Sequence, residues 1–286
     1  MKQIAFFGLG TMGIPIAKNL LKAGYCVTST AYNGHRRGID EIAQYGAHIV
    51  ATLKEAVQNA DVIMSIVPDD RAVQEIYLNK EMHSFIKEGA IIIEMTSCSA
   101  DTIIEVQRYY ADKAVSVIDA PVTGAKAGAE TGTLTILGAG NPAAIAEVQP
   151  LLEAISKKFY NLGAVGNGKL VKAVTNLMGA VNLAVVGEIY RFVSAKGIDM
   201  EQFFAVAQES AGSSTQFTRN FPKIVQQDYT STFALKLLRK DMGLALDMKE
   251  DVSMPISQYA YQLYQAATPF DYEDCSAIAK VDRLPD

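Results

Sequence analysis

The chain has 286 residues, of which 49% are hydrophobic and 20% are charged, and its formal net charge is −5. This length favours two domains, and a negative charge without a basic run argues against a nucleic-acid-binding protein. The three cysteines are far apart in sequence, so we expect no disulfide framework, a reducing compartment and a cytoplasmic location.

Strand-like and helix-like segments alternate through the first part of the chain. The predicted strands are residues 3–7, 27–30, 47–50, 61–67, 90–94, 116–119, 134–137 and 158–161. Helical patterns separate them, and this alternation predicts a parallel sheet with right-handed crossovers. Because the first strand begins by about Gln3, no signal segment is expected ahead of it.

A glycine-rich turn follows the first strand at once. It reads Gly8-Leu9-Gly10-Thr11-Met12-Gly13, and an amphipathic helix closed by Gly24 comes next. Glycines allow a tight turn and close approach of the backbone to a ligand, and a helix N-terminus favours a pyrophosphate. In this strand–turn–helix context the motif predicts a dinucleotide-binding loop, with a purely structural turn as the alternative.

The end of the second predicted strand bears on which dinucleotide is bound. An NAD site usually has an acidic residue about 20 residues after the glycines, whereas residues 29–37 contain none. Arg36 and Arg37 could hold a 2′-phosphate with paired hydrogen bonds. We therefore predict NADP, with NAD possible; for the two arginines, a solvated basic helix start is the alternative.

From Gly166 onward no strand pattern returns, and a helix with apolar residues at helical spacing extends from about Gly168 to Ala195. Its most apolar run, residues 177–186, is interrupted by Asn182 and is too short to cross a bilayer. We predict an α/β Rossmann domain over residues 1–163, followed by an all-α domain over residues 164–286, with the long helix joining them.

Several other patterns are rejected as functional sites. The run from Gly163 to Lys169 resembles the start of a phosphate-binding P-loop, but Leu170 replaces the hydroxyl residue that would hold Mg²⁺. Tyr109 and Lys113 have the spacing of a dehydrogenase pair, yet they close a polar surface helix. The three histidines are scattered, so no metal site is predicted.

The long helix carries the best candidate for acid–base chemistry. Reduction of a carbonyl needs a proton donor for the developing alkoxide, and the second half of the chain contains no histidine. Lys172 and Asn176 are four residues apart, so they share one helix face and could touch one small molecule. For Lys172, a snorkelling lysine at a helix start remains the equal alternative.

Four segments together resemble the β-hydroxyacid dehydrogenase family, which includes 3-hydroxyisobutyrate dehydrogenase, tartronate semialdehyde reductase and glyoxylate/succinic semialdehyde reductases, and is 6-phosphogluconate dehydrogenase-like. In order they are Gly8-Leu9-Gly10-Thr11-Met12-Gly13 with Ala17-Lys18-Asn19-Leu20, Asp119-Ala120-Pro121-Val122-Thr123-Gly124-Ala125-Lys126 with Gly132-Thr133-Leu134-Thr135, Gly166-x-Gly168-x-x-x-Lys172-x-x-x-Asn176, and Lys240-Asp241-Met242-Gly243-Leu244-Ala245-Leu246-Asp247. The resemblance spans nearly the whole chain.

The resemblance implies roles for individual residues. Lys172 would be the catalytic acid or base, Asn176 would help to hold the substrate, and the turn of Thr123, Gly124 and Ala125 would bind a substrate carboxylate. The implied cofactor-binding residues are Gly8, Leu9, Gly10, Thr11, Met12, Gly13, Asn33, Arg36, Arg37, Val67, Pro68, Ser97 and Lys240.

The chain departs from the family pattern at three of these places. Thr123 replaces the commoner serine, and Ala125 stands where many members have a second glycine. Thr175 replaces the first asparagine of the usual pair. Asn33 and Arg36 lie near, but not in line with, the family's Asn-Arg after the second strand.

The implied function is an NADP-dependent oxidoreductase that reversibly reduces a small semialdehyde or keto acid to the hydroxy acid. We expect a homodimer or homotetramer, a small carboxylate substrate, and no nucleic-acid or membrane partner. Two alternatives remain: an imine reductase on the same scaffold, and a non-catalytic dinucleotide-binding module. Retention of Lys172, Asn176 and the Thr123–Gly124 turn favours carbonyl chemistry over both.

Overall fold

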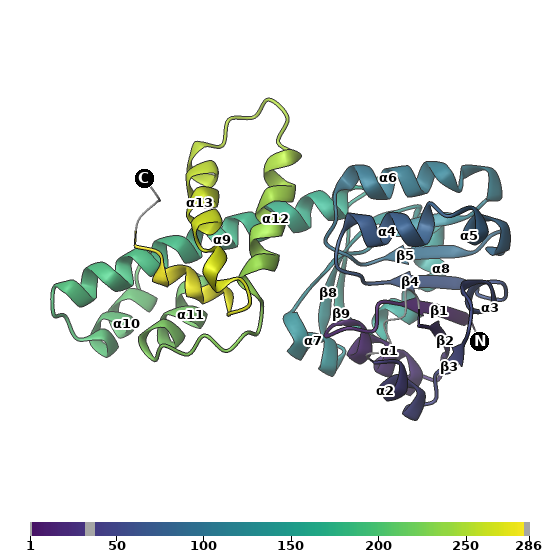
Figure 1. Ribbon diagram of the computed structural model, residues 1–286, viewed down its shortest axis with the longest axis horizontal. Coiled ribbons are helices and arrows are strands. Elements are labelled where there is room, and N and C mark those ends of the chain that lie inside the picture. Colours follow the sequence, from purple (N-terminus) through teal and green to yellow (C-terminus); the bar gives the residue numbers. More distant parts are fainter. Residues whose placement is uncertain (1, 32–37, 283–286) are drawn as a thin grey trace. The chain divides into compact units, whose positions relative to one another are not determined.

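The computed structural model describes residues 2–31 and 38–282. The chain divides into two compact units, Met1–Lys172 and Ala173–Asp286 (Figure 1). The division falls inside the long helix, whereas the sequence pattern set the border at the beginning of that helix. The assignment of cofactor binding to one domain and substrate binding and oligomerisation to the other stays a prediction.

The N-terminal unit alternates strands and helices. Its elements are β1 (Gln3–Phe7), α1 (Gly13–Lys22), β2 (Cys26–Thr30), α2 (Ile39–Gln44), β3 (His48–Val50), α3 (Leu53–Val57), β4 (Val62–Ser65), α4 (Asp70–Tyr77), α5 (Lys80–Phe85), β5 (Ile91–Glu94), α6 (Ala100–Tyr109), η2 (Ala111–Lys113), β6 (Ser116–Asp119), β7 (Val122–Thr123), α7 (Ala125–Thr131), β8 (Leu134–Gly140), α8 (Pro142–Glu153), β9 (Ser156–Asn161) and the start of α9 (Asn167–Ala195). The sequence pattern does not predict α5, α7 or β7, because each is too short to display a period.

The sheet has the strand order β3-β2-β1-β4-β5-β6-β8-β7, and β9 pairs with β8. From β3 to β6 neighbouring strands are parallel, so their carboxyl ends lie at one edge. The expectation of a parallel sheet throughout is wrong for β8, which is antiparallel to β6 and β7. A parallel connection needs a dozen or more residues, and only residues 124–133 separate β7 from β8.

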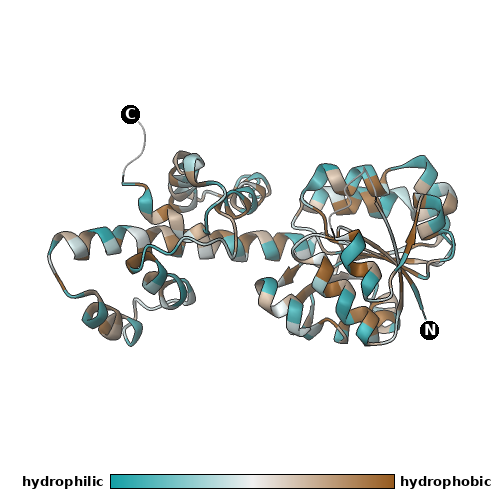
Figure 2. Ribbon diagram, turned by 60° about the horizontal axis from the view of Figure 1, so that its bottom comes forward, coloured by the Kyte–Doolittle hydropathy of each residue, from teal (hydrophilic) through white to brown (hydrophobic). Residues whose placement is uncertain are grey.

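Both faces of this sheet are covered. In β1, Ile4 and Phe6 face a core that includes residues of α1 and α8, whereas Ala5 and Phe7 face a core that includes residues of α4 and α6. The apolar strands between two helix layers are visible as brown ribbon (Figure 2). Because neither face is open, ligands reach such a sheet at its carboxyl edge.

The C-terminal unit is helical. After the rest of α9 it contains α10 (Met200–Gln208), α11 (Thr215–Val225), α12 (Leu235–Asp247), α13 (Pro255–Ala266), η3 (Thr268–Phe270) and η4 (Cys275–Lys280). Within residues 173–282, β-type pairing is limited to the single bridge between Ala234 and Asp274. The predicted fold class, an α/β Rossmann domain followed by an all-α domain joined by a long helix, is therefore confirmed.

Helix α9 is the central element of the helical core. The hydroxyl of the buried Tyr264 on α13 donates to the carbonyl of Ala180 on α9 at 3.1 Å. A Cβ on Gly187 would lie 2.8 Å from the Cα of Ala279, so the glycine lets η4 pack closely against α9. Phe217 and Phe221 of α11 are also buried in this core.

By length and composition α9 passes the test for a membrane-spanning helix, and 39% of its most apolar window is buried. The central helix of a globular core passes the same test, so this property alone carries little weight.

Candidate active site

The glycine loop of the N-terminal unit has the geometry of a phosphate-binding turn. Gly8 follows β1 with a φ of +91°, a conformation that side chains rarely adopt. A Cβ on Gly13 would lie 1.8 Å from the carbonyl oxygen of Gly8, so the start of α1 can meet the loop only without a side chain there. A Cβ on Gly10 would meet nothing within 4 Å. That open space is where a pyrophosphate approaches the backbone in dinucleotide-binding loops.

The N-terminus of α1 is suited to an anion. Met12 precedes the helix without a side-chain cap, and its first turn contains no acidic residue. The first backbone N–H groups therefore have no partner from a capping side chain, and the helix dipole favours negative charge beside them. Gly10 and Thr11 line an open hollow of about 530 Å³, to which Lys126 of α7 also contributes. The loop thus fits a dinucleotide phosphate.

The residues expected to discriminate NADP from NAD begin where β2 ends. Ser29 in β2 is buried and donates to the carbonyl of Phe6 at 2.7 Å, which fixes the strand beside β1. Asn33, Arg36 and Arg37 lie outside the described residues, so their predicted contacts with a 2′-phosphate stay a prediction.

Two segments expected to line the nicotinamide leave the sheet at the same edge. Val67 and Pro68 follow β4, Ser97 follows β5, and these two strands are neighbours. The N–H of Val67 donates to the hydroxyl of Thr96 at 2.9 Å, so the two segments are joined directly. The structure therefore brings Val67 and the Thr96–Ser97 segment together.

The predicted carboxylate-binding turn lies between β7 and α7. Thr123 ends the strand, and Thr123, Gly124 and Ala125 are all exposed. Gly124 has a φ of +129°, and Ala125 has a φ of +54°. An alanine in this left-handed region is strained, so the departure from a second glycine is accommodated at some cost in backbone energy.

The first turn of α9 is fixed against the carboxyl edge of the sheet. One oxygen of Asp119, the last residue of β6, accepts from the backbone N–H groups of Gly166 at 3.0 Å and Lys169 at 3.1 Å. A Cβ on Gly168 would lie 2.4 Å from the carbonyl oxygen of Leu137, so this glycine permits the close approach. Lys172 follows Lys169 by about one helical turn and is half-buried.

Lys169 itself is fully buried, which the sequence reasoning missed. Its ammonium lies 2.6 Å from a carboxylate oxygen of Glu94 and 3.3 Å from Asp119, and all three side chains have no exposed surface. Burial alone would lower the pKa of the lysine, but the charges of Glu94 and Asp119 outweigh it and raise the pKa. A lysine held in this way cannot reach a nucleotide phosphate, which agrees with rejection of the P-loop pattern.

In the helical unit, Asn176 and Lys240 share a partner. The amide of Asn176 donates to one oxygen of the buried Asp241 at 2.6 Å, and the Lys240 ammonium lies 3.5 Å from its other oxygen. Asp241 therefore orients two residues that the sequence singled out. It stands within the Lys240–Asp247 motif, which was the available signal.

Comparisons with known proteins cover both units. The family model described as the NAD binding domain of 6-phosphogluconate dehydrogenase matches residues 3–166. The model described as NAD-binding of NADP-dependent 3-hydroxyisobutyrate dehydrogenase matches residues 166–281.

Individual relatives match over nearly their whole length. A 2-(hydroxymethyl)glutarate dehydrogenase from Eubacterium barkeri is 32% identical, with 98% of this chain and 94% of that protein covered. An NAD-dependent L-serine dehydrogenase from Pseudomonas aeruginosa is 29% identical, with 98% of each chain covered. The structure of a Mycobacterium tuberculosis 3-hydroxyisobutyrate dehydrogenase with L-serine superposes with a TM-score of 0.92 at 26% identity, covering 99% of this chain and 100% of that one. The chain therefore belongs to the β-hydroxyacid dehydrogenase family and is an NAD(P)-dependent hydroxyacid dehydrogenase.

Proposed function

We propose that the enzyme reversibly reduces a small semialdehyde or keto acid to the hydroxy acid with NADP(H), and that Lys172 is its general acid and base. The observation that carries the proposal is the anchoring of α9: Asp119 and Gly168 hold its first turn at the edge where the glycine loop also lies. A lysine one turn further along a helix fixed in this way has a defined position, as proton transfer requires.

The bound cofactor supplies a hydride to the carbonyl carbon. As the carbon–oxygen π bond breaks, its electron pair moves to the oxygen, and the Lys172 ammonium donates a proton there. In the reverse direction the neutral amine takes the proton from the hydroxyl. The exposed Thr123–Gly124 turn would hold the substrate carboxylate through its hydroxyl and N–H groups, and Asn176, oriented by Asp241, would hold the substrate from the helical unit.

The substrate class can be tested by a cofactor-oxidation screen. The panel consists of glyoxylate, succinic semialdehyde, tartronate semialdehyde and methylmalonate semialdehyde, and L-serine is assayed in the oxidative direction because two relatives carry it in their names. We expect turnover of at least one small carboxylate. Turnover of cyclic imines without activity on any member of the panel would select imine reduction instead. Binding of NADP without turnover of either class would select the binding module.

We expect a preference for NADP over NAD that depends on Arg36 and Arg37. A bidentate contact between arginine and phosphate contributes about 1.5–3 kcal/mol, and each 1.4 kcal/mol corresponds to about tenfold in affinity. Replacing both arginines with alanine should therefore weaken NADP binding at least tenfold and leave NAD binding nearly unchanged. Titration of both cofactors measures this. An equal loss for both, or a wild-type preference for NAD, contradicts the assignment.

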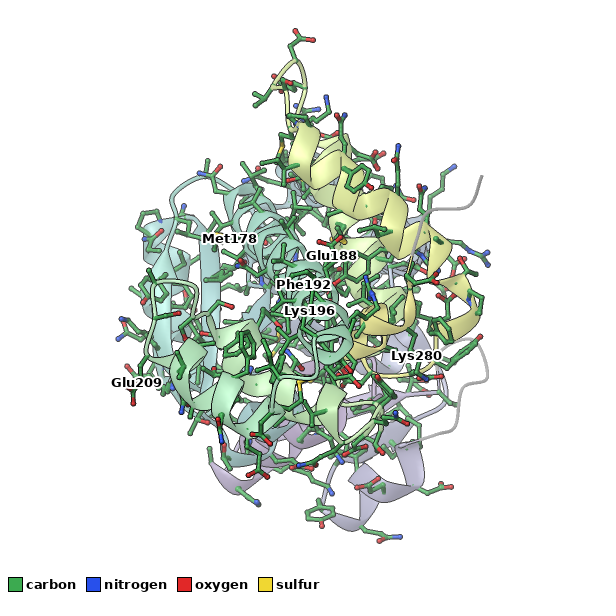
Figure 3. All side chains as sticks on the ribbon, turned by 90° about the vertical axis from the view of Figure 1, so that its left-hand side faces the viewer. Met178, Glu188, Phe192, Lys196, Glu209 and Lys280 are labelled. Carbon is green, nitrogen blue, oxygen red and sulfur yellow. The ribbon has the colours of Figure 1, made fainter. Side chains whose placement is uncertain are left out.

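We also propose that a second copy of the chain covers an apolar stripe on α9, defined by Met178, Val185 and Phe192. These side chains are 64%, 51% and 60% exposed and are seven residues apart, so they follow one side of the helix. Figure 3 labels two of them, Met178 and Phe192. The stripe lies on the element that also forms the core of its unit, so α9 carries apolar residues on more than one side and needs a partner there.

Phe192→Glu should therefore shift the protein toward monomers. Full burial of such a side chain contributes about 1.5–3 kcal/mol, which corresponds to a rise of at least about tenfold in the dissociation constant. Val252→Glu is the matched control, because Val252 is 62% exposed and follows α12. Sedimentation velocity at micromolar concentration measures both. A wild-type protein that is strictly monomeric contradicts the proposal.

A further inference from the structure

The buried Lys169 ammonium uses all of its hydrogen-bonding capacity within the protein. It donates to the Glu94 carboxylate at 2.6 Å, to the Glu94 carbonyl at 2.9 Å and to the Thr96 carbonyl at 2.8 Å. An ammonium has three N–H groups, so none is left for a substrate or cofactor. The function of Lys169 must therefore be exerted through the groups that it holds.

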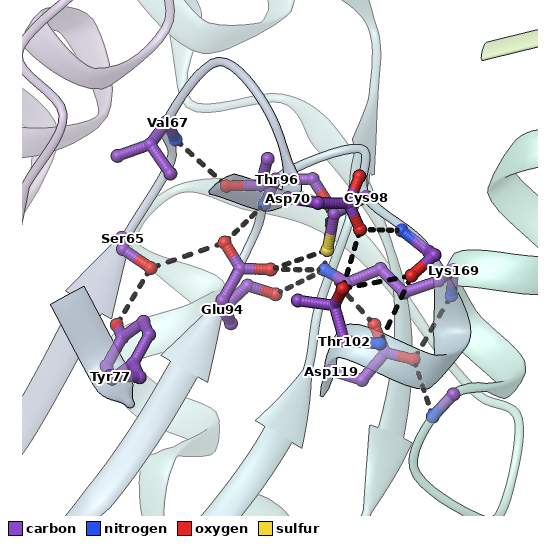
Figure 4. Close-up of polar contacts among 12 residues, drawn as sticks. Ser65, Val67, Asp70, Tyr77, Glu94, Thr96, Cys98, Thr102, Asp119 and Lys169 are labelled. Carbon is purple, nitrogen blue, oxygen red and sulfur yellow. Dashed lines mark hydrogen bonds and ion pairs between the residues drawn. The ribbon is translucent and has the colours of Figure 1, made fainter. Parts of the chain in front are cut away.

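Those groups belong to the segments that follow β4 and β5. The other oxygen of Glu94 accepts from the backbone N–H of Thr96 at 2.9 Å and from the Ser65 hydroxyl at 3.3 Å. The Thr96 hydroxyl accepts from the N–H of Val67, as described above. Figure 4 shows this chain of contacts from Tyr77 through Ser65 and Glu94 to Lys169. Lys169 thus ties α9 to both segments expected to line the nicotinamide.

Stability alone does not account for this arrangement. Placing charges in a protein interior is costly, and apolar residues of similar volume often serve stability equally well. What directional hydrogen bonds add is orientation, because the ammonium satisfies all three acceptors only in one placement of the helix turn. Asp119 reinforces that placement from the other side by binding the backbone of the same turn.

We propose that Lys169 is a positioning residue that sets Lys172 and the nicotinamide-lining segments relative to each other. This inference rests on the proposed function, in which Lys172 moves the proton and Val67, Pro68 and Ser97 line the nicotinamide. Displacement of a reacting group by about 1 Å can cost up to about 100-fold in rate, so loss of the network should reduce hydride transfer without removing any group that touches the substrate.

The test compares Lys169→Met/Glu94→Gln, which removes both charges together, with Thr96→Val, which removes only the acceptor for the Val67 N–H. Ser156→Ala is the control, because it deletes a buried hydrogen bond to Leu152 elsewhere in the same unit. For each variant we measure circular dichroism, kcat, KM, the deuterium isotope effect on hydride transfer, and the affinities for NADPH and for adenosine 2′,5′-bisphosphate.

For the double variant we expect a drop in kcat of about 10–100-fold, a larger isotope effect, and weaker binding of NADPH but not of the adenosine fragment. Thr96→Val should show the same selective pattern to a smaller degree, and it decides the matter if the double variant does not fold. Ser156→Ala should leave kcat and both affinities unchanged. A folded double variant, or Thr96→Val in its place, with wild-type kcat and wild-type NADPH affinity overturns the inference. That result leaves the proposed function standing, whereas a wild-type enzyme that reduces no carbonyl substrate overturns both.

Discussion

Replacing Lys172 with alanine should lower kcat by about 10²–10⁴-fold, the usual contribution of a positioned general acid. The contact between the ammonium and the carbonyl oxygen strengthens as negative charge develops on that oxygen, so it lowers the barrier more than it tightens substrate binding. Binding of NADP should stay nearly unchanged, because the glycine loop is formed by β1 and α1 and not by α9. Steady-state kinetics on the accepted carbonyl substrate and cofactor titration measure the two quantities.

Two further variants separate this role from that of a surface lysine. Lys172→Arg should not restore activity, since a guanidinium does not release its proton near neutral pH. Asn176→Ala should be milder and should raise KM as well, because its amide is held by Asp241 and positions the substrate without transferring a proton. A Lys172→Ala enzyme that keeps more than about a tenth of the wild-type kcat would contradict the assignment.

The glycine loop should separate folding from cofactor binding. Gly13→Ala should destabilise the N-terminal unit and abolish measurable cofactor binding, because its Cβ would lie 1.8 Å from the backbone oxygen of Gly8. Gly10→Ala should fold with a stability within about 0.5 kcal/mol of wild type, since a Cβ there meets nothing within 4 Å. It should nevertheless weaken cofactor binding at least about tenfold, because the methyl group occupies the space through which the pyrophosphate approaches.

Thermal unfolding without cofactor and titration with NADP measure both effects. Wild-type affinity in Gly10→Ala would show that the loop does not meet the cofactor backbone-first. Unchanged stability in Gly13→Ala would show that the contact between Gly8 and Gly13 is looser than described.

The parts of the fold that follow from local pattern are predictable from the sequence. The apolar run of β1, the glycine turn and the amphipathic α1 are contiguous, so each supports the assignment of the next. The length of α9 follows in the same way from its sustained helical period. The antiparallel direction of β8 does not follow, because the direction of a strand depends on how its connection is routed, and α7 has only 7 residues.

The buried network around Lys169 was beyond sequence reasoning for a different physical reason. Lys169 and Glu94 are 75 residues apart, and a lysine in the first turn of a helix is ordinarily solvated. A partial signal was present, since Glu94 and Asp119 each end an apolar strand and neighbouring parallel strands end at the same edge. The left-handed conformation of Ala125 had no such signal, because alanine rarely adopts it.

The most direct test of the central claim follows the hydride itself. The wild-type enzyme is incubated with NADPH that carries deuterium on the transferred position of the nicotinamide, together with the semialdehyde or keto acid that it accepts. The hydroxy acid product is then analysed by mass spectrometry and NMR. We predict one deuterium per product molecule, bonded to the carbon that bears the new hydroxyl group. Product without deuterium at that carbon, or no hydroxy acid from any carbonyl substrate in the panel, would contradict the account.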